Sequence, residues 1–504
     1  MTRSVSRFPR CALLAVILVI PAVPAAQSQN ELAARSQEGS AALRARRFEE
    51  AVRIFRELAT ARPEEAGLHM NLGMALAMAG QEADAIAPLE RAVALNPALA
   101  PAHLFLGSSY LALGHPDKAV PPLERAVAGG STSVETRRML ASAYAALGRH
   151  AEAAAQLRRV TEAAPKMPAG WYALGHAYNA LAQDALASFQ NQPEDSPWRR
   201  VLVADALAAD GRLADAFALY REMLAVLPAM TAIRDSIARI YERSGRSDWA
   251  AQERAQAPAG PKCAGSKAMC EFRAGRHRAA LSAALAGADP ESQYWRIRAA
   301  TALAEAAFKR LDALPDSRER REVRATRAMA ERRFADAVTE LKVALSFAPG
   351  DPALLDDLGS AYYFARDYEP AVSILSGLLK QDPASVRLLT LTGDALAQLQ
   401  RLDEAIPLLQ SAAAAAGGDP TPRSVLGRAY VMKGEFAAAI PLLEPQLAGD
   451  RDGSVHVQLA RAYQGVGNRE KAEPLLKRAQ ELQERAQARD AASEPQRITP
   501  PKGH

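Results

Sequence analysis

Apolar residues recur at helical spacing along most of this chain, in blocks that repeat. The stretch from Leu106 to Val127 reads LGSSYLALGHPDKAVPPLERAV, and the stretch from Leu426 to Leu447 reads LGRAYVMKGEFAAAIPLLEPQL. Because Leu106 and Tyr110 are four residues apart, they share one face of a helix. Each block therefore predicts two amphipathic helices joined at a Gly. Such a hairpin cannot bury its apolar face alone, so the hairpins must stack on one another.

The blocks follow one another at a spacing of about 34 residues. The clear copies are marked by a small residue in the second helix: Ala85, Ala119, Ala153, Ala371, Ala405, Ala439 and Ala472. Weaker copies centre on Ala51, Ala216, Ala250 and Ala337. A composition that is 49% hydrophobic but only 6% aromatic supplies mostly Ala and Leu, which favour helices over a sheet core.

These blocks resemble the tetratricopeptide repeat, whose pattern is Trp-x2-Leu-Gly-x2-Tyr, then Ala-x3-Phe, then Pro. Trp171, Leu174, Gly175 and Tyr178 match its first half completely. The resemblance covers about residues 32–486. It implies an all-α fold, a right-handed α-solenoid of stacked helix-turn-helix units.

We divide the chain by the quality of the repeats. Residues 27–230 are predicted to form an N-terminal array, residues 318–486 a C-terminal array, and residues 487–504 a disordered tail, because that tail is polar and contains paired prolines. Between the arrays, residues 231–317 keep the register poorly. They form either a joint between two wings of the solenoid or simply decayed repeats.

Two segments near this centre echo each other. The segment from Trp171, WYALGHAYNALAQDALASFQNQPEDS, is similar to the later YWRIRAATALAEAAFKRLDALPDS, and both lack the usual turn glycine. We interpret them as shortened units that belong to a larger duplication.

The first 26 residues predict a secretory signal peptide. Arg3, Arg7 and Arg10 form a basic start, Cys11–Ile20 is an unbroken apolar run, and small residues follow. The run is too short for a comfortable membrane span, so we expect cleavage near Ala26 and no stable span afterwards, with a retained anchor as the alternative. The mature protein would then be periplasmic or secreted.

Net charge and cysteine content restrict the expected partners and sites. The formal net charge of +5 includes the three Arg of the leader, so the mature chain is close to neutral and nucleic acid is not an expected partner. Cys263 and Cys270 are the only cysteines outside the leader. In an exported chain such a close pair predicts a disulfide, whereas a metal site would need further ligands nearby.

The sequence contains no catalytic signature, such as His-Glu-x-x-His, a Walker loop or Gly-x-Ser-x-Gly. We therefore expect no enzyme activity, no cofactor and no metal. The resemblance implies instead a concave groove lined mainly by first helices. Its candidate residues are Met70, Met74, Met78, Leu104, Tyr172, His176, Asn179, Trp198, Asp205, Tyr363, Phe364, Asp394, Arg428 and Arg461. For the three Met, packing against a neighbouring helix is the alternative interpretation.

The resulting hypothesis is a non-catalytic scaffold of the cell envelope or secreted space that binds a partner protein, as a peptide segment or a folded surface, in this groove. Two alternatives remain open at this point. One is a carbohydrate- or peptide-binding module that assists polysaccharide export or envelope assembly. The other is the regulatory half of an enzyme, although repeats that run almost to residue 486 leave little room for a catalytic domain.

Overall fold

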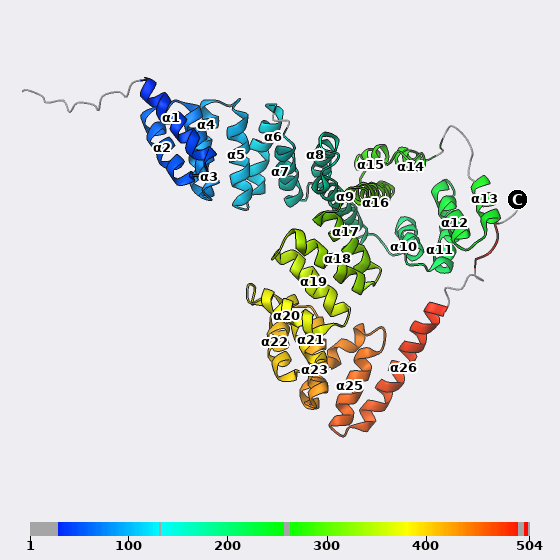
Figure 1. Cartoon of the computed structure of the whole chain (residues 1–504). Coiled ribbons are helices and arrows are strands. Elements are labelled where there is room, and N and C mark those ends of the chain that lie inside the picture. Colours follow the sequence, from blue (N-terminus) through cyan, green and yellow to red (C-terminus); the bar gives the residue numbers. More distant parts are fainter. Residues whose placement is uncertain (1–28, 131–132, 257–262, 264, 492–497, 502–504) are drawn as a thin grey trace, which may run out of the picture. The chain divides into compact units, whose positions relative to one another are not determined.

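The structure is a computed structural model that describes residues 29–130, 133–256, 263, 265–491 and 498–501. The described residues form helices throughout and no strand, as Figure 1 shows. The predicted all-α solenoid of stacked hairpins is confirmed. The chain divides into two compact units, residues 1–147 and residues 148–504. The predicted signal peptide lies outside the described residues.

The first unit contains seven helices in its described part. They are α1 (Gln29–Arg44), α2 (Phe48–Ala61), α3 (Ala66–Met78), α4 (Glu82–Leu95), α5 (Ala100–Ala112), α6 (Pro116–Ala128) and α7 (Val134–Ala146). Consecutive helices from α1 to α7 pack on one another as antiparallel hairpins.

The second unit begins with α8 and ends beyond α26. Its first part contains α8 (His150–Ala163), α9 (Pro168–Phe189), α10 (Pro197–Ala209), α11 (Leu213–Val226), α12 (Thr231–Arg243), α13 (Ser247–Ala255), α14 (Lys267–Arg273), α15 (His277–Leu285) and α16 (Pro290–Asp312). Its second part contains α17 (Arg318–Ala330), α18 (Phe334–Phe347), α19 (Pro352–Phe364), α20 (Tyr368–Leu379), α21 (Val386–Gln398), α22 (Leu402–Ala415), α23 (Thr421–Lys433), α24 (Phe436–Leu443), the 3-10 helix η1 (Glu444–Gly449), α25 (Ser454–Gly465) and α26 (Arg469–Ala491).

A glycine in the first helix lets the two helices of a hairpin approach closely. A Cβ atom at Gly107 of α5 would lie only 2.4 Å from Cγ of Leu123 in α6, well inside van der Waals contact. Ala119, one turn before Leu123, is completely buried. The same contact recurs sixteen positions apart in four other hairpins: Gly73 with Leu89, Gly359 with Leu375, Gly393 with Leu409, and Gly427 with Leu443. The repeated Leu-Gly of the sequence therefore marks the crossing point of each hairpin.

Helix α9 breaks this rule, because its partner helix lies far along the chain. A Cβ atom at Gly175 would lie 2.4 Å from Cε1 of Phe308, in α16. Ala304, four residues before Phe308, is buried, so α16 carries the Ala-x3-Phe half of the motif whose first half is in α9. The two helices, 22 and 23 residues long, pack along each other. They form one repeat hairpin that is split by residues 190–289.

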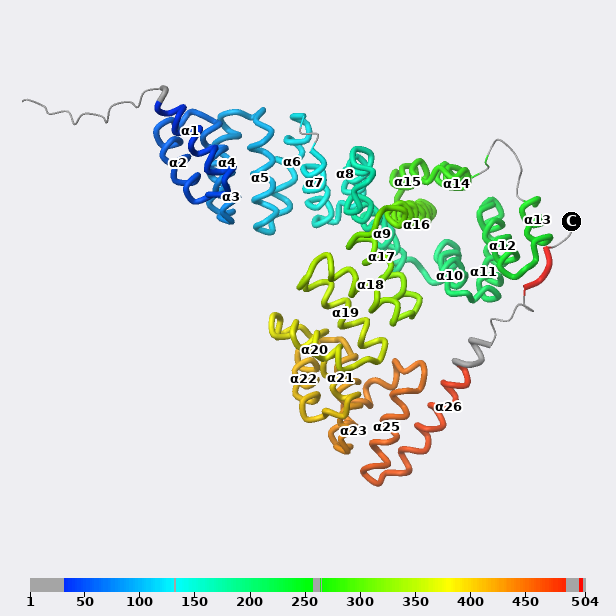
Figure 2. Tube along the Cα trace, viewed as in Figure 1, coloured from blue at the N-terminus to red at the C-terminus, as the bar shows by residue number. Residues whose placement is uncertain are grey.

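The inserted residues form three hairpins of their own, α10 with α11, α12 with α13, and α14 with α15, which we call the side array (Figure 2). The side array has an aromatic core that is unlike the Ala and Leu core of the other hairpins. Tyr220, Tyr241, Tyr294 and Trp295 are among the largest side chains that are fully buried. The last two belong to α16, so the side array and the split hairpin share this core.

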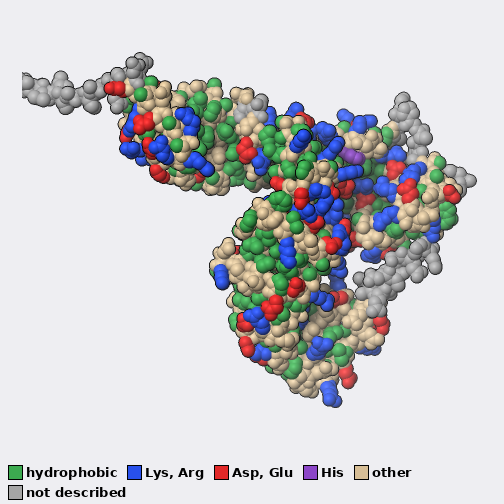
Figure 3. Space-filling model, in the orientation of Figure 1, with side chains coloured by type: hydrophobic (Ala, Val, Ile, Leu, Met, Phe, Trp, Pro, Cys, Tyr) green, Lys and Arg blue, Asp and Glu red, His purple; other side chains and the backbone are tan. Residues whose placement is uncertain are grey.

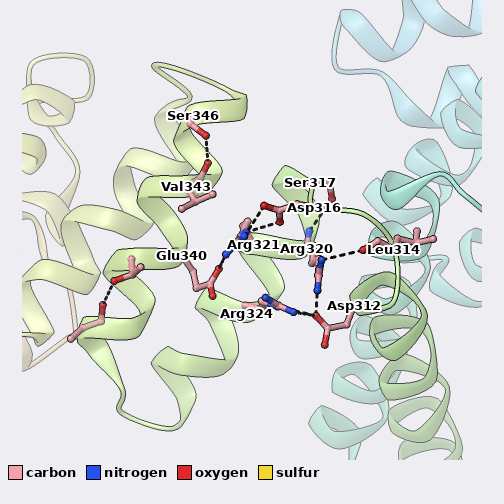
Figure 4. Close-up of polar contacts among 12 residues, drawn as sticks. Asp312, Leu314, Asp316, Ser317, Arg320, Arg321, Arg324, Glu340, Val343 and Ser346 are labelled. Atoms are coloured by element: carbon pink, nitrogen blue, oxygen red, sulfur yellow. Dashed lines mark hydrogen bonds and ion pairs between the residues drawn. The ribbon is translucent and has the colours of Figure 1, made fainter.

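Polar contacts fix the point where the chain rejoins the regular hairpins, between α16 and α17 (Figure 4). Asp312 at the end of α16 accepts hydrogen bonds from Nε of Arg324 (2.8 Å) and Nε of Arg320 (3.2 Å). Burial alone would raise the pKa of Asp312, but these hydrogen bonds outweigh it and hold the pKa below its ordinary value. Arg321, between them in sequence, donates instead to Glu340 of α18 (2.8 Å). The α17 arginines thus tie the split hairpin to the next one.

The structure corrects two expectations about the centre of the chain. The irregular part begins with α10, inside the predicted array 27–230, and is an insertion within a hairpin, neither a joint between wings nor a run of decayed repeats confined to 231–317. The two echoing segments are the two halves of one hairpin and do not mark a duplication. The first lacks a turn glycine because the chain leaves this hairpin after α9 and does not turn there, and the second is itself the second helix of the hairpin, which follows the position of a turn.

The C-terminal tail also differs from the expected disorder of residues 487–504. Helix α26 continues to Ala491, and Ile498 is only 3% exposed because it packs into the core of the side array. Residues 492–497 and 502–504 lie outside the described part of the chain.

Candidate interaction surfaces

A buried carboxylate links three successive first helices in the C-terminal part of the second unit. Asp394 of α21 is 3% exposed. Its Oδ2 accepts hydrogen bonds from the hydroxyl of Tyr363 in α19 (2.5 Å) and from Nη2 of Arg428 in α23 (2.6 Å). Gln398 donates to Oδ1 (3.2 Å). The structure thus brings together three groove candidates that are far apart in sequence, and we call them the Asp394 cluster.

The Asp394 cluster is a fixed arrangement with an open side. Burial and the adjacent Asp394 raise the pKa of Tyr363, so its phenol stays protonated and donates. The Arg428 side chain is 35% exposed, and a guanidinium has five N–H donors, so donors remain for a ligand. Phe364, next to Tyr363, is 48% exposed. Arg461 is exposed on α25, and no hydrogen bond or ion pair among the described residues joins it to this cluster.

The ring of Phe364 is held by its neighbours even though one side faces solvent. It stacks on Phe334 of α18 with ring centroids 5.6 Å apart, and it meets Tyr363 edge to face at 5.2 Å. A rigid, half-exposed aromatic ring loses little entropy when a partner covers it. It adjoins Tyr363 of the Asp394 cluster, so an exposed aromatic ring borders a cluster that also holds a partly exposed guanidinium.

A second carboxylate, the half-buried Asp205 of α10, organises the side array. It accepts hydrogen bonds from the hydroxyls of Tyr220 (2.5 Å) and Tyr294 (2.8 Å) and from Nη1 of Arg298 (2.9 Å to Oδ2). Burial raises the pKa of both tyrosines, which therefore remain donors. Trp198, another groove candidate, packs on the side-array core with its ring 5.7 Å from Tyr294. Trp198 is therefore part of the packing around Asp205.

Asp205 lies on the wall of an open cleft of about 570 Å³ between the side array and α16. Apolar side chains such as Leu202, Phe272 and Ile297 line most of it. Arg239 and Arg298 also line a neighbouring cleft of about 610 Å³. An open, mostly apolar cleft with a few fixed charges has the character of a ligand or peptide site.

The candidates on α9 form a third group. Tyr172 and His176 have ring centroids 4.3 Å apart, and His176 meets Phe308 of α16 at 5.4 Å. Burial and a hydrogen bond with Glu322 of α17 raise the pKa of Tyr172. Asn179 is half-buried on the same helix. Tyr172 and His176 therefore lie at the contact between the split hairpin and α17, away from the Asp394 cluster.

The candidates in the first unit lie on α3 and α5. Met74 packs against the core of this unit, Met70 and Leu104 are half-buried, and Met78 is 43% exposed. The stripe of three Met is thus divided: Met74 takes part in packing, as the alternative interpretation held, and Met78 offers its side chain to solvent.

Charge on the visible face is mixed. Lys and Arg side chains alternate with acidic ones over the face shown in Figure 3 and form no single basic field there. Among the described residues, no group of His, Cys, Asp or Glu is arranged to hold a metal ion. In that part of the chain, too, no helix is both long enough and apolar enough to span a bilayer.

In the structure the sulfur atoms of Cys263 and Cys270 are bonded to each other. The disulfide connects Cys263, four residues before α14, to Cys270 in the middle of that short helix. The side chain of Ser266 caps α14 by accepting a hydrogen bond from the amide of Met269.

Sequence reasoning missed Tyr220, Tyr294 and Arg298, the partners of Asp205. They lie on a second helix of the side array and on α16, whereas only first-helix positions were considered. One signal was available: Ala304 and Phe308 have the spacing of the second half of the motif, without a first half ahead of them at the usual distance.

Comparison with known sequences agrees with this geometry. Sequence models of the tetratricopeptide repeat match residues 36–101, 104–168, 138–190 and 357–420, and two further models of the same repeat match 396–456 and 453–485. The chain belongs to the tetratricopeptide repeat family. The matches stop at residue 190 and resume at residue 357, so they leave out the side array, the second half of the split repeat and the hairpin of α17 and α18. Tetratricopeptide repeat proteins act as scaffolds for protein interaction, and none of the matching models is catalytic.

Solved structures of other repeat proteins are similar to parts of this chain. A crystal structure of MamA is 23% identical over 30% of this chain and 81% of its own, with a TM-score of 0.28. A MamA structure labelled AMB-1 is 30% identical over 32% of this chain and 97% of its own, with a TM-score of 0.29. A structure of Naa15/Naa10 bound to HypK-THB is 16% identical over 92% of this chain and 78% of its own, with a TM-score of 0.32. No curated protein matches the sequence.

Proposed function

We propose that this tetratricopeptide repeat protein is an exported, non-catalytic scaffold that binds a segment of a partner protein on the first-helix face around the Asp394 cluster. The observation that carries the proposal is the Asp394 cluster, in which Asp394 holds the partly exposed guanidinium of Arg428 and also binds Tyr363, the neighbour of exposed Phe364. The ring offers apolar contact, and the unused N–H groups of Arg428 can donate to a carboxylate or a backbone carbonyl of the partner.

The arrangement is prepared before the partner arrives. Asp394 is satisfied by Tyr363, Gln398 and Arg428, so it needs no ligand for its own stability. Since these contacts join α19, α21 and α23, the face can bind without reordering three helices. Such a surface suits an extended segment with an apolar side chain close to an acidic or carbonyl group.

Export is the second part of the proposal. Its support is the signal-like pattern of residues 1–26 together with the disulfide between Cys263 and Cys270, since disulfides persist in oxidising compartments such as the periplasm or the medium. The expected mature chain starts near Gln27 and contains two cysteines, both bonded.

Two exposed phenylalanines give a matched test of the binding face. Phe364 is on a first helix and 48% exposed, whereas Phe347 ends a second helix and is 51% exposed. The mature chain, used as bait on envelope fractions, should retain a partner that Phe364→Ala and Arg428→Glu release and that Phe347→Ala keeps. Cross-linking with mass spectrometry then locates the bound segment. If the Phe364→Ala and Phe347→Ala variants retain the partner equally, the proposed binding face is wrong.

The location is tested separately on purified protein from the native host. Cell fractionation with N-terminal sequencing should find the chain outside the cytoplasm and beginning near Gln27. Thiol titration in denaturant should find no free thiol before reduction and two after it. Two free thiols in the unreduced protein, or an intact leader in the cytoplasm, would contradict export.

A further inference from the structure

The last described residues of the chain, Ile498 to Pro501, pack on the side array, as the red segment beside α13 in Figure 1 shows. Ile498 is 3% exposed and belongs to the same core cluster as Tyr241. Thr499 and Pro500 are exposed. The segment is therefore held by one buried side chain and by its backbone.

Consecutive backbone carbonyls of this segment each accept a hydrogen bond from the side array. Nη1 of Arg246 donates to the carbonyl of Ile498 at 3.0 Å, and the hydroxyl of Tyr241 donates to the carbonyl of Thr499 at 2.7 Å. Nη2 of Arg221 reaches the carbonyl of Pro500 at 3.3 Å. Carbonyl spacing along an extended chain is thus matched by donors from α11, α12 and the turn before α13.

These contacts use only acceptors of the bound segment. Proline has no backbone N–H, so most binding sites that pair with a peptide backbone lose a hydrogen bond when proline enters. A row of donors that binds only carbonyls loses no hydrogen bond when proline enters. The restricted backbone of proline also lowers the entropy cost of binding an extended chain. The site therefore suits an apolar residue followed by prolines, which is the chemistry of Ile498-Thr499-Pro500-Pro501.

The donors are held in place by the side array. Glu253, whose side chain is fully buried, forms ion pairs with Arg234 (2.7 Å) and Arg221 (3.4 Å). Arg221 also donates to the hydroxyl of Tyr241 at 3.0 Å. The Arg246 guanidinium lies 4.8 Å from the centre of the Trp249 ring. Each donor that binds the segment thus has a second contact that orients it.

We propose that Arg221, Tyr241 and Arg246 form a binding site for an extended, proline-containing peptide, and that residues 498–501 of the same chain occupy it in cis. The occupied site anchors the end of the C-terminal hairpins to the side array. It also makes the tail a tethered competitor for any other segment of this chemistry. A tethered segment acts at an effective concentration of the order of 1 mM, so a tail with an intrinsic Kd of about 100 μM would weaken the binding of an external peptide roughly tenfold.

A labelled peptide tests the site directly. The probe is a fluorescein-labelled peptide of residues 496–504, measured by fluorescence anisotropy against the full mature chain. The full chain carrying Ile498→Asp, in which the tail cannot enter the apolar pocket, should bind the probe at least about tenfold more tightly than the wild-type chain. A chain that ends at residue 497 serves as a second form with an unoccupied site (an open form). It carries no substitution, so its folding does not depend on accommodating an Asp at position 498.

Further variants separate the site from the tail. Adding Tyr241→Phe to Ile498→Asp removes the hydroxyl that donates to the Thr499 carbonyl and accepts from Arg221, and it should weaken binding of the probe about two- to tenfold. A probe with Asp in place of Ile should not bind. Thr499→Ala in the full chain is the matched control, because the Thr499 side chain is exposed and its carbonyl is kept, so this variant should exclude the probe as the wild type does.

Several results would overturn the proposal. The site does not exist if neither open form binds the probe up to about 1 mM, the effective concentration of the tail. The tail is not its occupant if wild-type and open chains bind the probe equally. Occupation in cis is wrong if the wild-type chain forms a dimer in sedimentation experiments and Ile498→Asp makes it monomeric, because the tail would then come from a second copy.

Discussion

Single residues at the hairpin turns show a local conflict between conformation and side chain. The turn after a first helix requires a left-handed residue, which Gly114 provides with a φ of +75°. Four hairpins place another residue there: Arg46, Arg332, Arg366 and Gln400, with φ between 58° and 62°. A side chain in this region costs about 1–2 kcal/mol. These turns are tolerated because the packing of the two helices determines the turn.

Gln400→Gly should therefore stabilise its hairpin. Relief of the left-handed strain exceeds the extra entropy of Gly in the unfolded chain, so we expect a net gain of about 0.5–1 kcal/mol in the local free energy of unfolding. Hydrogen exchange of α21 and α22 measures it. Gly114→Gln in the first unit is the reverse change and should destabilise α5 and α6; a loss of protection in α21 and α22 on Gln400→Gly would contradict this account.

A buried hydrogen bond between His456 and Asp450 at the start of α25 gives a pH dependence. Nδ1 of His456 lies 2.6 Å from Oδ2 of Asp450, and the same oxygen accepts from the His456 amide at 2.9 Å. Burial would raise the pKa of Asp450, but the hydrogen bonds from the side chain and backbone of His456 outweigh it and lower that pKa.

Because the folded pKa of Asp450 is below its unfolded value, its contribution to stability is complete above about pH 4 and is lost as the pH falls through the folded pKa. The protection of α25 against hydrogen exchange, corrected for the intrinsic rate, should fall over this range in the wild type. In the Asp450→Asn variant this position cannot titrate. The protection of α25 should therefore be lower than in the wild type above about pH 4 and change little as the pH falls. An equal pH slope in both proteins would show that Asp450 is not responsible.

At the scale of the elements, the crossing contact decides which helices pair. A glycine-to-leucine contact sixteen positions along the chain closes an ordinary hairpin, and the contact of Gly175 with Phe308 closes the split one. The side array can occupy residues 190–289 because the end of α9 and the start of α16 lie together, so an insertion between them does not separate the two helices. Short connections at such sites tolerate insertions well.

Gly175→Val tests the split hairpin. The added side chain meets the rigid ring of Phe308, and overpacking of this kind costs about 1–3 kcal/mol. Hydrogen exchange should increase in α9 and in α16 together, although residues 190–289 separate them in sequence. Gly67→Ala in α3 is the control, because nothing lies within 4 Å of the added atom. Increased exchange in α9 alone would mean that α16 is not its partner.

At the scale of the second unit, stability should be local, because each hairpin contacts mainly its neighbours. Separate apolar clusters serve the hairpins around α19, around α22 and around α25, and a further one serves the side array. A single free energy of unfolding therefore does not describe this unit.

Leu409→Ala should show this locality. Leu409 is fully buried against Gly393, and such a truncation costs about 2–5 kcal/mol. Hydrogen exchange should increase in α21 to α23 and stay unchanged in α10 to α12. Leu476→Ala in α26 is the matched control. That leucine is 38% exposed, so its truncation should lower the free energy of unfolding by much less than about 2 kcal/mol. A uniform loss of protection across the unit would indicate one cooperative body.

The sequence by itself determined the regular hairpins, because each depends on contacts within about 34 residues and the Leu, Gly, Tyr and Ala of each block record those contacts. It also pointed to Tyr363, Asp394 and Arg428, since equivalent positions of successive first helices lie side by side in any such array. Only the tertiary structure decided that α9 pairs with α16, that Tyr220, Tyr294 and Arg298 surround Asp205, and that Ile498 returns to the side array. These contacts join residues without a fixed spacing, so no period in the sequence records them.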